Sequence, residues 1–135
     1  MINHPLSNII SQTKLLEELA DQYGTPTYVY SKSRLEHNIN ELLKAINISF
    51  ANYQIYYAVK ANSNINIIKI LKNKFNDLGC DCSSPGELFA AEKANVSMSD
   101  CVYTGNYESI EDLKTAFNKG AEINLDDLNS FNRLK

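Results

Sequence analysis

The sequence predicts an α/β fold built on a parallel sheet, and its repeating order of strands and helices is the main reason. Strand-like segments at residues 54–60, 79–83, 101–104 and 122–125 recur about every 20 to 25 residues, and a helical pattern follows each. Such alternation favours right-handed crossovers between parallel strands. Four such units make half of a (β/α)8 barrel, which typically needs about 250 residues. A flavodoxin-like sheet fits the same count, so periodicity alone does not decide how the sheet closes.

Composition excludes several classes of protein. The 135 residues are 44% hydrophobic and 21% charged, which is typical of a soluble globular domain. The net charge is −3 and no basic cluster is present, which argues against a nucleic-acid partner. The apolar runs are far shorter than the roughly 20 residues that a membrane span needs, and the first residues lack a secretory signal. We therefore expect a cytoplasmic protein with neither a nucleic-acid nor a membrane partner.

The cysteines do not predict a metal site. Cys80 and Cys82 have C-x-C spacing, which is neither a redox nor a zinc pattern, and only one further cysteine, Cys101, and two histidines are available. Cys80 and Cys82 alternate onto one face of a short strand. We expect both to be small core residues in a reduced protein.

The first third of the chain predicts a helix, a strand and a second helix. Helical spacing runs over residues 6–23 and ends at Gly24. Residues 27–30 are β-branched or aromatic, which predicts a short strand. Ser33 and Glu36 have the spacing of a capping box before a helix that reaches about residue 48.

Capping signals open two of the later helices. Ser84 and Glu87 flank a proline at the first helical position, which predicts a helix through Ala94. Ser109 and Asp112 predict a further helix, which runs to a glycine at position 120. These starts follow strands directly, so the residues after position 48 divide into four strand–helix units.

Polar residues gather where the predicted strands end. Parallel α/β sheets place their chemistry at the carboxyl edge of the strands, however the sheet closes. The polar residues at these four ends are Lys60 and Asn62, Asp81 and Ser83, Thr104 and Asn106, and Asp126 and Asp127. We therefore expect the functional site at this edge.

Lys60 is the strongest candidate for covalent chemistry. Strand alternation places Ala58 and Lys60 on one face, and the small Ala58 leaves room for a flat ring. Burial at the end of an apolar strand would favour the neutral, nucleophilic amine of Lys60. From spacing alone, a lysine that simply reaches solvent is the simpler interpretation.

Four segments together resemble one enzyme family. Residues 57–62, YAVKAN, resemble the segment of fold-type III pyridoxal-phosphate decarboxylases in which the lysine holds the cofactor. Residues 23–30, YGTPTYVY, are similar to the start of diaminopimelate decarboxylases. Residues 81–88, DCSSPGEL, and 103–106, YTGN, resemble two further family segments. Three of the four segments occur in the family's order and spacing. The resemblance covers roughly residues 20–128.

The resemblance implies a fold, a cofactor and an activity. The fold would be a (β/α)8 TIM-type barrel of the alanine-racemase-like kind, with roughly its first half in residues 49–135. Residues 1–48 would be the lead-in, part of a β-domain and the barrel entry. Full-length members are expected to be homodimers that use pyridoxal 5'-phosphate to decarboxylate meso-2,6-diaminopimelate to L-lysine, the last step of lysine biosynthesis.

By the same resemblance, Lys60 is the catalytic residue, and Lys60, Ala58 and Asp81 form the cofactor site. Glu87 would lie near the mouth of the active site, although its capping role explains it equally well. A glycine-rich phosphate loop and an acidic partner for the pyridine nitrogen would follow Lys135 in family order. We therefore expect the 135 residues alone to be inactive. Ornithine/arginine or carboxynorspermidine decarboxylases, and a non-catalytic cofactor-binding fragment, stay open as alternatives.

Overall fold

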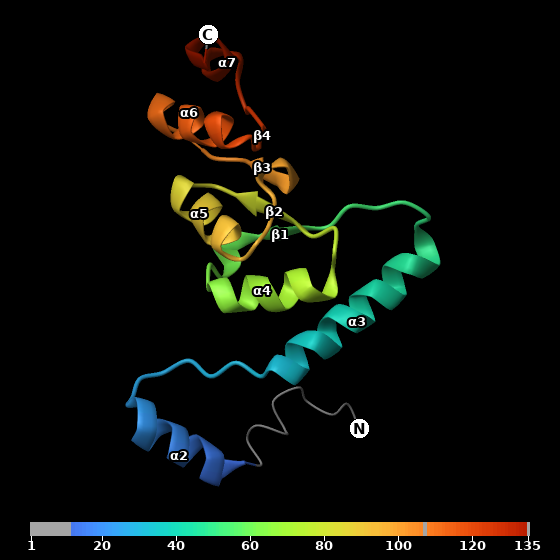
Figure 1. Ribbon diagram of the computed structural model, residues 1–135, viewed down its shortest axis with the longest axis vertical. Coiled ribbons are helices and arrows are strands. Elements are labelled where there is room, and N and C mark those ends of the chain that lie inside the picture. The colour runs from blue at the N-terminus through green and yellow to red at the C-terminus, as the bar shows by residue number, and fades with distance from the viewer. Residues whose placement is uncertain (1–11, 107, 135) are drawn as a thin grey trace.

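A computed structural model describes residues 12–106 and 108–134, and its centre is a four-stranded parallel sheet. The strands are β1 (Tyr56–Ala58), β2 (Gly79–Cys82), β3 (Cys101–Tyr103) and β4 (Glu122–Ile123). They lie in the order β1-β2-β3-β4, as Figure 1 shows. The prediction of adjacent parallel strands in chain order is confirmed. A doubly wound sheet would reverse direction at a switch point, and these four strands do not.

Helices alternate with the strands. Their bounds are α2 (Thr13–Tyr23), α3 (Lys32–Ser49), α4 (Ile65–Lys74), α5 (Pro85–Lys93), α6 (Ile110–Lys119) and α7 (Leu128–Leu134), with 3-10 turns η1 (Val59–Ala61) and η2 (Met98–Asp100). Consecutive helices from α4 to α7 contact one another, and Figure 1 shows them following the sheet in the same order. Among the described residues, no helix is long and apolar enough to cross a membrane.

The two faces of the sheet differ in character. Cys80 and Cys82 of β2 are fully buried in a cluster with Leu88 of α5 and Leu113 of α6, so this face packs against the helices. Side chains alternate along a strand, so Asp81 lies on the opposite face. Its neighbours across the sheet are Ala58 of β1 and Val102 of β3. We call this opposite side the inner face.

The predicted caps of α5 and α6 are confirmed. The Ser84 hydroxyl accepts a hydrogen bond from the Glu87 amide at 3.2 Å, and Ser109 accepts one from the Asp112 amide at 3.0 Å. Each such N-cap contributes about 1 kcal/mol to stability. Gly120 ends α6 in the left-handed conformation, with φ of 86°, which glycine adopts at no steric cost.

Two predictions for the first third of the chain are wrong. Helix α3 begins at Lys32 with Ser31 as its N-cap, accepting from the Arg34 amide at 3.3 Å, while the Ser33 hydroxyl pairs with that of Ser31 at 3.1 Å. Residues 27–30 form no strand, because no described segment pairs with them. Of the predicted helix over 6–23, the part before residue 12 lies outside the described residues.

Gly79 is required by a close approach of three chain segments. A Cβ built there would lie 2.5 Å from the main-chain oxygen of Asp100 and 2.6 Å from the ring of Tyr56. Gly86, by contrast, would meet only the Ser84 hydroxyl oxygen, at 3.8 Å. The two glycines therefore form a matched pair for substitution.

We expect Gly79→Ala to destabilise the protein by about 1–3 kcal/mol, because a main-chain carbonyl must shift to admit the methyl group. Gly86→Ala should be neutral or stabilising by up to about 1 kcal/mol. Alanine has fewer backbone conformations than glycine in the unfolded chain, so less entropy is lost when the helix forms. Urea denaturation of both variants measures the difference. Equal stabilities would contradict the close approach at Gly79.

Candidate functional site

The four strand ends meet at one edge, as the sequence predicts. Beyond the last residues of the strands, the Thr104 amide donates to the Cys82 carbonyl at 2.8 Å and the Asn124 amide donates to the Tyr103 carbonyl at 2.9 Å. The side-chain amide of Asn124 also reaches the Thr104 hydroxyl at 3.4 Å. Hydrogen bonds thus continue into the loops and hold neighbouring strand ends together.

Lys60 lies at this edge, but not in a strand. Strand β1 ends at Ala58, and Lys60 is the central residue of the turn η1. Val59 takes the fully buried position of the turn, which leaves the Lys60 side chain exposed. In the described part of the chain, this exposure agrees with the simpler interpretation from spacing, a lysine that reaches solvent. No hydrogen bond or ion pair to another described residue occupies its amine.

A set of hydrogen bonds fixes the turn that carries Lys60. The Asn62 amide donates to the Val59 carbonyl at 3.1 Å, and the Tyr57 hydroxyl donates to the Asn62 carbonyl at 3.0 Å. The Asn62 side-chain oxygen then accepts from the Asn64 amide at 3.0 Å. Asn64 is itself the N-cap of α4. The turn is therefore tied to β1 on one side and to α4 on the other.

Ala58 and Asp81 come together on the inner face. They are cross-strand partners in the β1–β2 register, and both are half-buried. Asp81 makes no hydrogen bond or ion pair within the described residues, so its carboxylate is available to a ligand. Ala58 thus places a small side chain beside a carboxylate with no described partner, and Lys60 follows two residues later at the same edge of the sheet.

Glu87 serves the start of α5. Its carboxylate accepts from the Ser83 amide at 2.8 Å and from the Ser83 hydroxyl at 3.1 and 3.2 Å. These contacts satisfy an amide just before the helix, a variant of the capping box in which the glutamate reaches one residue further back. Of the two roles considered for Glu87, the described contacts support capping.

A polar cavity of about 520 Å3 lies at the same carboxyl edge of the sheet, beside the ends of β3 and β4. Its lining residues are Asn106, Glu108, Asp126, Asp127, Ser130 and Arg133. Glu108 is only 9% exposed, and its side chain lies against Gly105, where a Cβ would come within 2.5 Å of the Glu108 Cγ. Sequence reasoning missed Glu108 and Arg133, because nothing in the local pattern marks a glutamate before a helix cap as buried.

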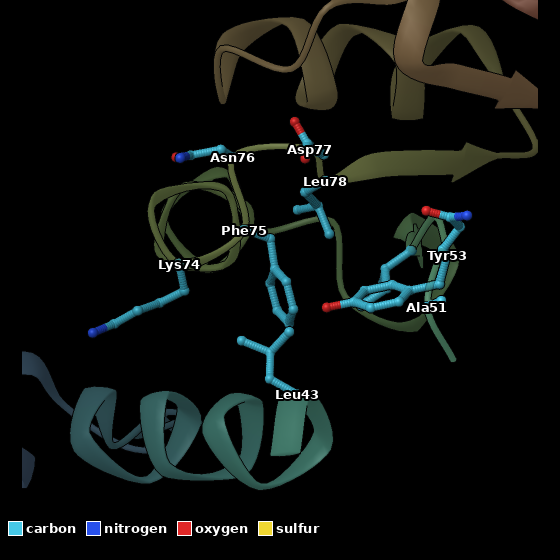
Figure 2. Close-up of a pocket in the computed structure, with 10 residues that line it drawn as sticks. Leu43, Ala51, Tyr53, Lys74, Phe75, Asn76, Asp77 and Leu78 are labelled. Carbon is cyan, nitrogen blue, oxygen red and sulfur yellow. The ribbon is translucent and has the colours of Figure 1, made fainter. Parts of the chain in front are cut away.

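A cavity of about 410 Å3 lies at the opposite end of the sheet, among residues that precede β1 and β2. Figure 2 shows Phe75 pointing from the end of α4 toward Leu43 of α3, with Leu78 and Tyr53 beside it. The cavity lies at the amino ends of the strands, where parallel sheets keep structural residues. It is therefore not our candidate site.

The three cysteines belong to the core on the helix side of the sheet. Cys80, Cys82 and Cys101 have no exposed surface, and the Cys101 thiol donates to the Ser97 carbonyl at 3.4 Å. Hydrogen bonding to Cys101, followed by burial, raises the pKa of the Cys80 and Cys82 thiols. The prediction of core residues is confirmed. In the described part of the chain, no cluster of three or more candidate ligands could hold a metal ion.

Comparison with known proteins assigns the chain to a family. Residues 36–135 match the family model described as "Pyridoxal-dependent decarboxylase, pyridoxal binding domain". The chain therefore belongs to this family of pyridoxal-dependent decarboxylases. The family confirms the predicted barrel, of which the chain forms an amino-terminal part, and the predicted pyridoxal cofactor.

Individual relatives support the same family assignment. The diaminopimelate decarboxylase of Methanothermobacter thermautotrophicus is 37% identical over 117 residues, which cover 87% of this chain and 27% of that protein. The structure of the M. jannaschii diaminopimelate decarboxylase is 29% identical, with a TM-score of 0.76, over 87% of this chain and 28% of that one. This chain thus spans about a quarter of the length of the relatives that it matches.

Two other solved structures have a similar fold but differ in sequence identity to this chain. A Helicobacter pylori diaminopimelate decarboxylase complexed with L-lysine is 27% identical, with a TM-score of 0.72, over 88% of this chain and 29% of that one. A Vibrio vulnificus lysine/ornithine decarboxylase has a TM-score of 0.74 but only 18% identity, over 92% of this chain and 33% of that one. The second comparison shows the shared fold alone.

We expect none of the three cysteines to react with iodoacetamide in the native protein, because their thiols are fully buried and the reagent cannot reach them. All three should react after denaturation. Mass spectrometry of the native and denatured samples counts the labels. Rapid native labelling of any one thiol would contradict its place in the core.

Proposed function

We propose that this chain forms the lysine-bearing part of the cofactor site of a diaminopimelate decarboxylase, with Lys60 holding pyridoxal phosphate covalently. The observation that carries the proposal is the exposed, unpaired amine of Lys60 on a turn fixed at the carboxyl edge of the parallel sheet. Membership of the pyridoxal-dependent decarboxylase family supplies the cofactor for which such a lysine is suited.

The choice of diaminopimelate as substrate rests on the closer relatives. Those at 30% identity or more include several diaminopimelate decarboxylases, from archaea and bacteria. The matched structures of lysine/ornithine and arginine decarboxylases are 18% and 21% identical and support the fold only. The proposed reaction releases carbon dioxide from meso-diaminopimelate and gives L-lysine.

The described residues fit the lysine-and-ring end of the cofactor. Ala58 has a small side chain beside Asp81 on the inner face, and Asp81 offers a carboxylate with no other described partner. When bound, the pyridoxal ring would accept the electron pair left by the departing carboxylate. In this scheme Lys60 attaches the cofactor, Asp81 provides a polar contact beside it, and Ala58 keeps its place clear.

The proposal extends to the setting of the full-length protein. We infer a cytoplasmic homodimer that takes a small amino-acid substrate, in keeping with the resemblance of the sequence to this family. The net charge of −3 and the lack of a basic cluster support the absence of a nucleic-acid partner. Size-exclusion chromatography with light scattering on the full-length protein tests the dimer.

Borohydride reduction of the protein after incubation with pyridoxal phosphate should place the pyridoxyl mass on Lys60. The reason is that Lys60 lies at the carboxyl edge of the sheet, two residues after Ala58, which pairs with Asp81 in the proposed cofactor site. Lys60→Ala should lose the label, whereas Lys69→Ala, which removes an exposed lysine of α4, should keep it. Peptide mapping locates the label. A label spread evenly over the lysines would contradict the assignment.

Carbon dioxide release from meso-diaminopimelate and from ornithine, measured on the full-length protein, tests the choice of substrate. We expect release from the first substrate only, and its loss in Lys60→Ala. Preference for ornithine would move the protein to another branch of the family.

Ala58→Leu should weaken pyridoxal phosphate binding by roughly 10-fold or more, because about three added carbon atoms would occupy the space beside Asp81. The fold should persist, since Ala58 is half-buried on the inner face rather than in the helix-side core. Ala45→Leu, the same substitution at an exposed position of α3, is the matched control. A fluorescence titration of the cofactor measures both. Equal affinities would remove Ala58 from the site.

A further inference from the structure

We propose that Tyr57 and Asn62 are positioning residues for Lys60, and that Tyr30 ties their turn to the amino-terminal segment. The inference rests on the proposed function for the role of Lys60. It adds residues whose observed hydrogen bonds are to the chain around the lysine. They act by holding the main chain on both sides of the lysine.

Tyr57 joins the turn to the core. Its ring packs against both buried clusters, one beneath α5 and α6 and one between α3 and α4. Its hydroxyl extends beyond these clusters and donates a hydrogen bond to the Asn62 carbonyl at 3.0 Å. Burial raises the pKa of the Tyr57 phenol, so the hydroxyl keeps its proton and remains a donor. A rigid aromatic side chain thus spans the turn that contains Lys60.

Asn62 connects this bond to two other segments. Its side-chain oxygen accepts from the Asn64 amide at 3.0 Å, and its side-chain nitrogen donates to the Tyr30 hydroxyl at 3.0 Å. Tyr30 lies 32 residues earlier, in the extended segment before α3. All the hydrogen-bonding groups of the Asn62 side chain and main chain therefore have distinct uses, with its amide bonded to Val59.

The arrangement explains how an exposed lysine can be held in place. Within the described residues, the Lys60 side chain has no hydrogen bond or ion pair that would fix it, whereas Val59 is buried and Asn62 is hydrogen-bonded. A net hydrogen bond shifts an opening equilibrium by roughly 2- to 10-fold. Loss of the Tyr57 bond should therefore let the turn open more often without exposing the core.

The test compares Tyr57→Phe with Tyr56→Phe, which removes a neighbouring hydroxyl that has no described partner. We expect amide hydrogen exchange in residues 59–63 to be roughly 2- to 10-fold faster in Tyr57→Phe only. Pyridoxyl labelling of Lys60, relative to Lys69 in the same molecule, should slow by a similar factor. Acetylation of Lys60 by acetic anhydride, which reports exposure, should not change.

A second pair, Tyr30→Phe and Tyr28→Phe, tests the outer tie at exposed positions, where misfolding is not a concern. We expect roughly 2-fold faster exchange in residues 59–63 for Tyr30→Phe only, since exposed hydrogen bonds are at the weak end of the range. Both variants should melt at the temperature of the unmodified protein.

The outcomes separate this inference from the proposed function. If Lys60 of the unmodified protein takes no selective pyridoxyl label, the proposed function fails, and the exchange rates alone decide whether Tyr57 and Asn62 hold the turn. If Tyr57→Phe and Tyr56→Phe give equal exchange and equal labelling, the positioning role is overturned. A fall in acetylation that matches the fall in pyridoxyl labelling would also overturn it, because it would indicate altered exposure.

Discussion

The parallel register between β1 and β2 is the constraint on which the candidate site depends. It pairs Ala58 with Asp81 and sends Tyr57 and Cys80 to the opposite, helix-covered face. A shift of one residue would exchange these sets and would direct Asp81 into the apolar core. The cost of burying an unpaired carboxylate therefore holds the register that gathers the polar residues at one edge.

Close packing at small residues supports this register. Gly79 admits the Tyr56 ring and the Asp100 carbonyl at distances that no side chain would permit, and Gly105 does the same for Glu108. Buried side chains of very different size, the small Cys80, Cys82 and Cys101 and the large Tyr103, fill the helix side of β2 and β3. Close packing of buried side chains thus fixes the helix side of the sheet. The cost of burying the Asp81 carboxylate fixes which residues face the inner side.

The sequence predicted the parts of the fold that local chemistry determines. The caps at Ser84 and Ser109 and the four strands follow from residue type and spacing, and all are found. The strand at residues 27–30 was wrong, because a strand requires a hydrogen-bonded partner that local propensity cannot supply. Lys60 lies outside the strand for a similar reason, because packing between distant segments decides where the strand ends. The turn η1 begins at Val59, whose side chain is buried by packing across the sheet.

The segment from Tyr57 to Asn62 is recognisable because separate physical demands determine its residues. Tyr57 fills two clusters and still donates a hydrogen bond, Val59 is fully buried, and Asn62 serves three neighbouring segments. Between these structural positions, Ala58 and Lys60 are left to face the inner side and the solvent at the strand edge. Residues that hold the fold therefore alternate in this short stretch with Ala58 and Lys60, the residues proposed for the cofactor site. Changing Tyr57, Val59 or Asn62 should therefore disturb the position of Ala58 or Lys60. The sequence singled out this stretch because both kinds of constraint act on consecutive residues, whereas Glu108, which packs against Gly105 and lines a cavity with residues around α7, left no such pattern.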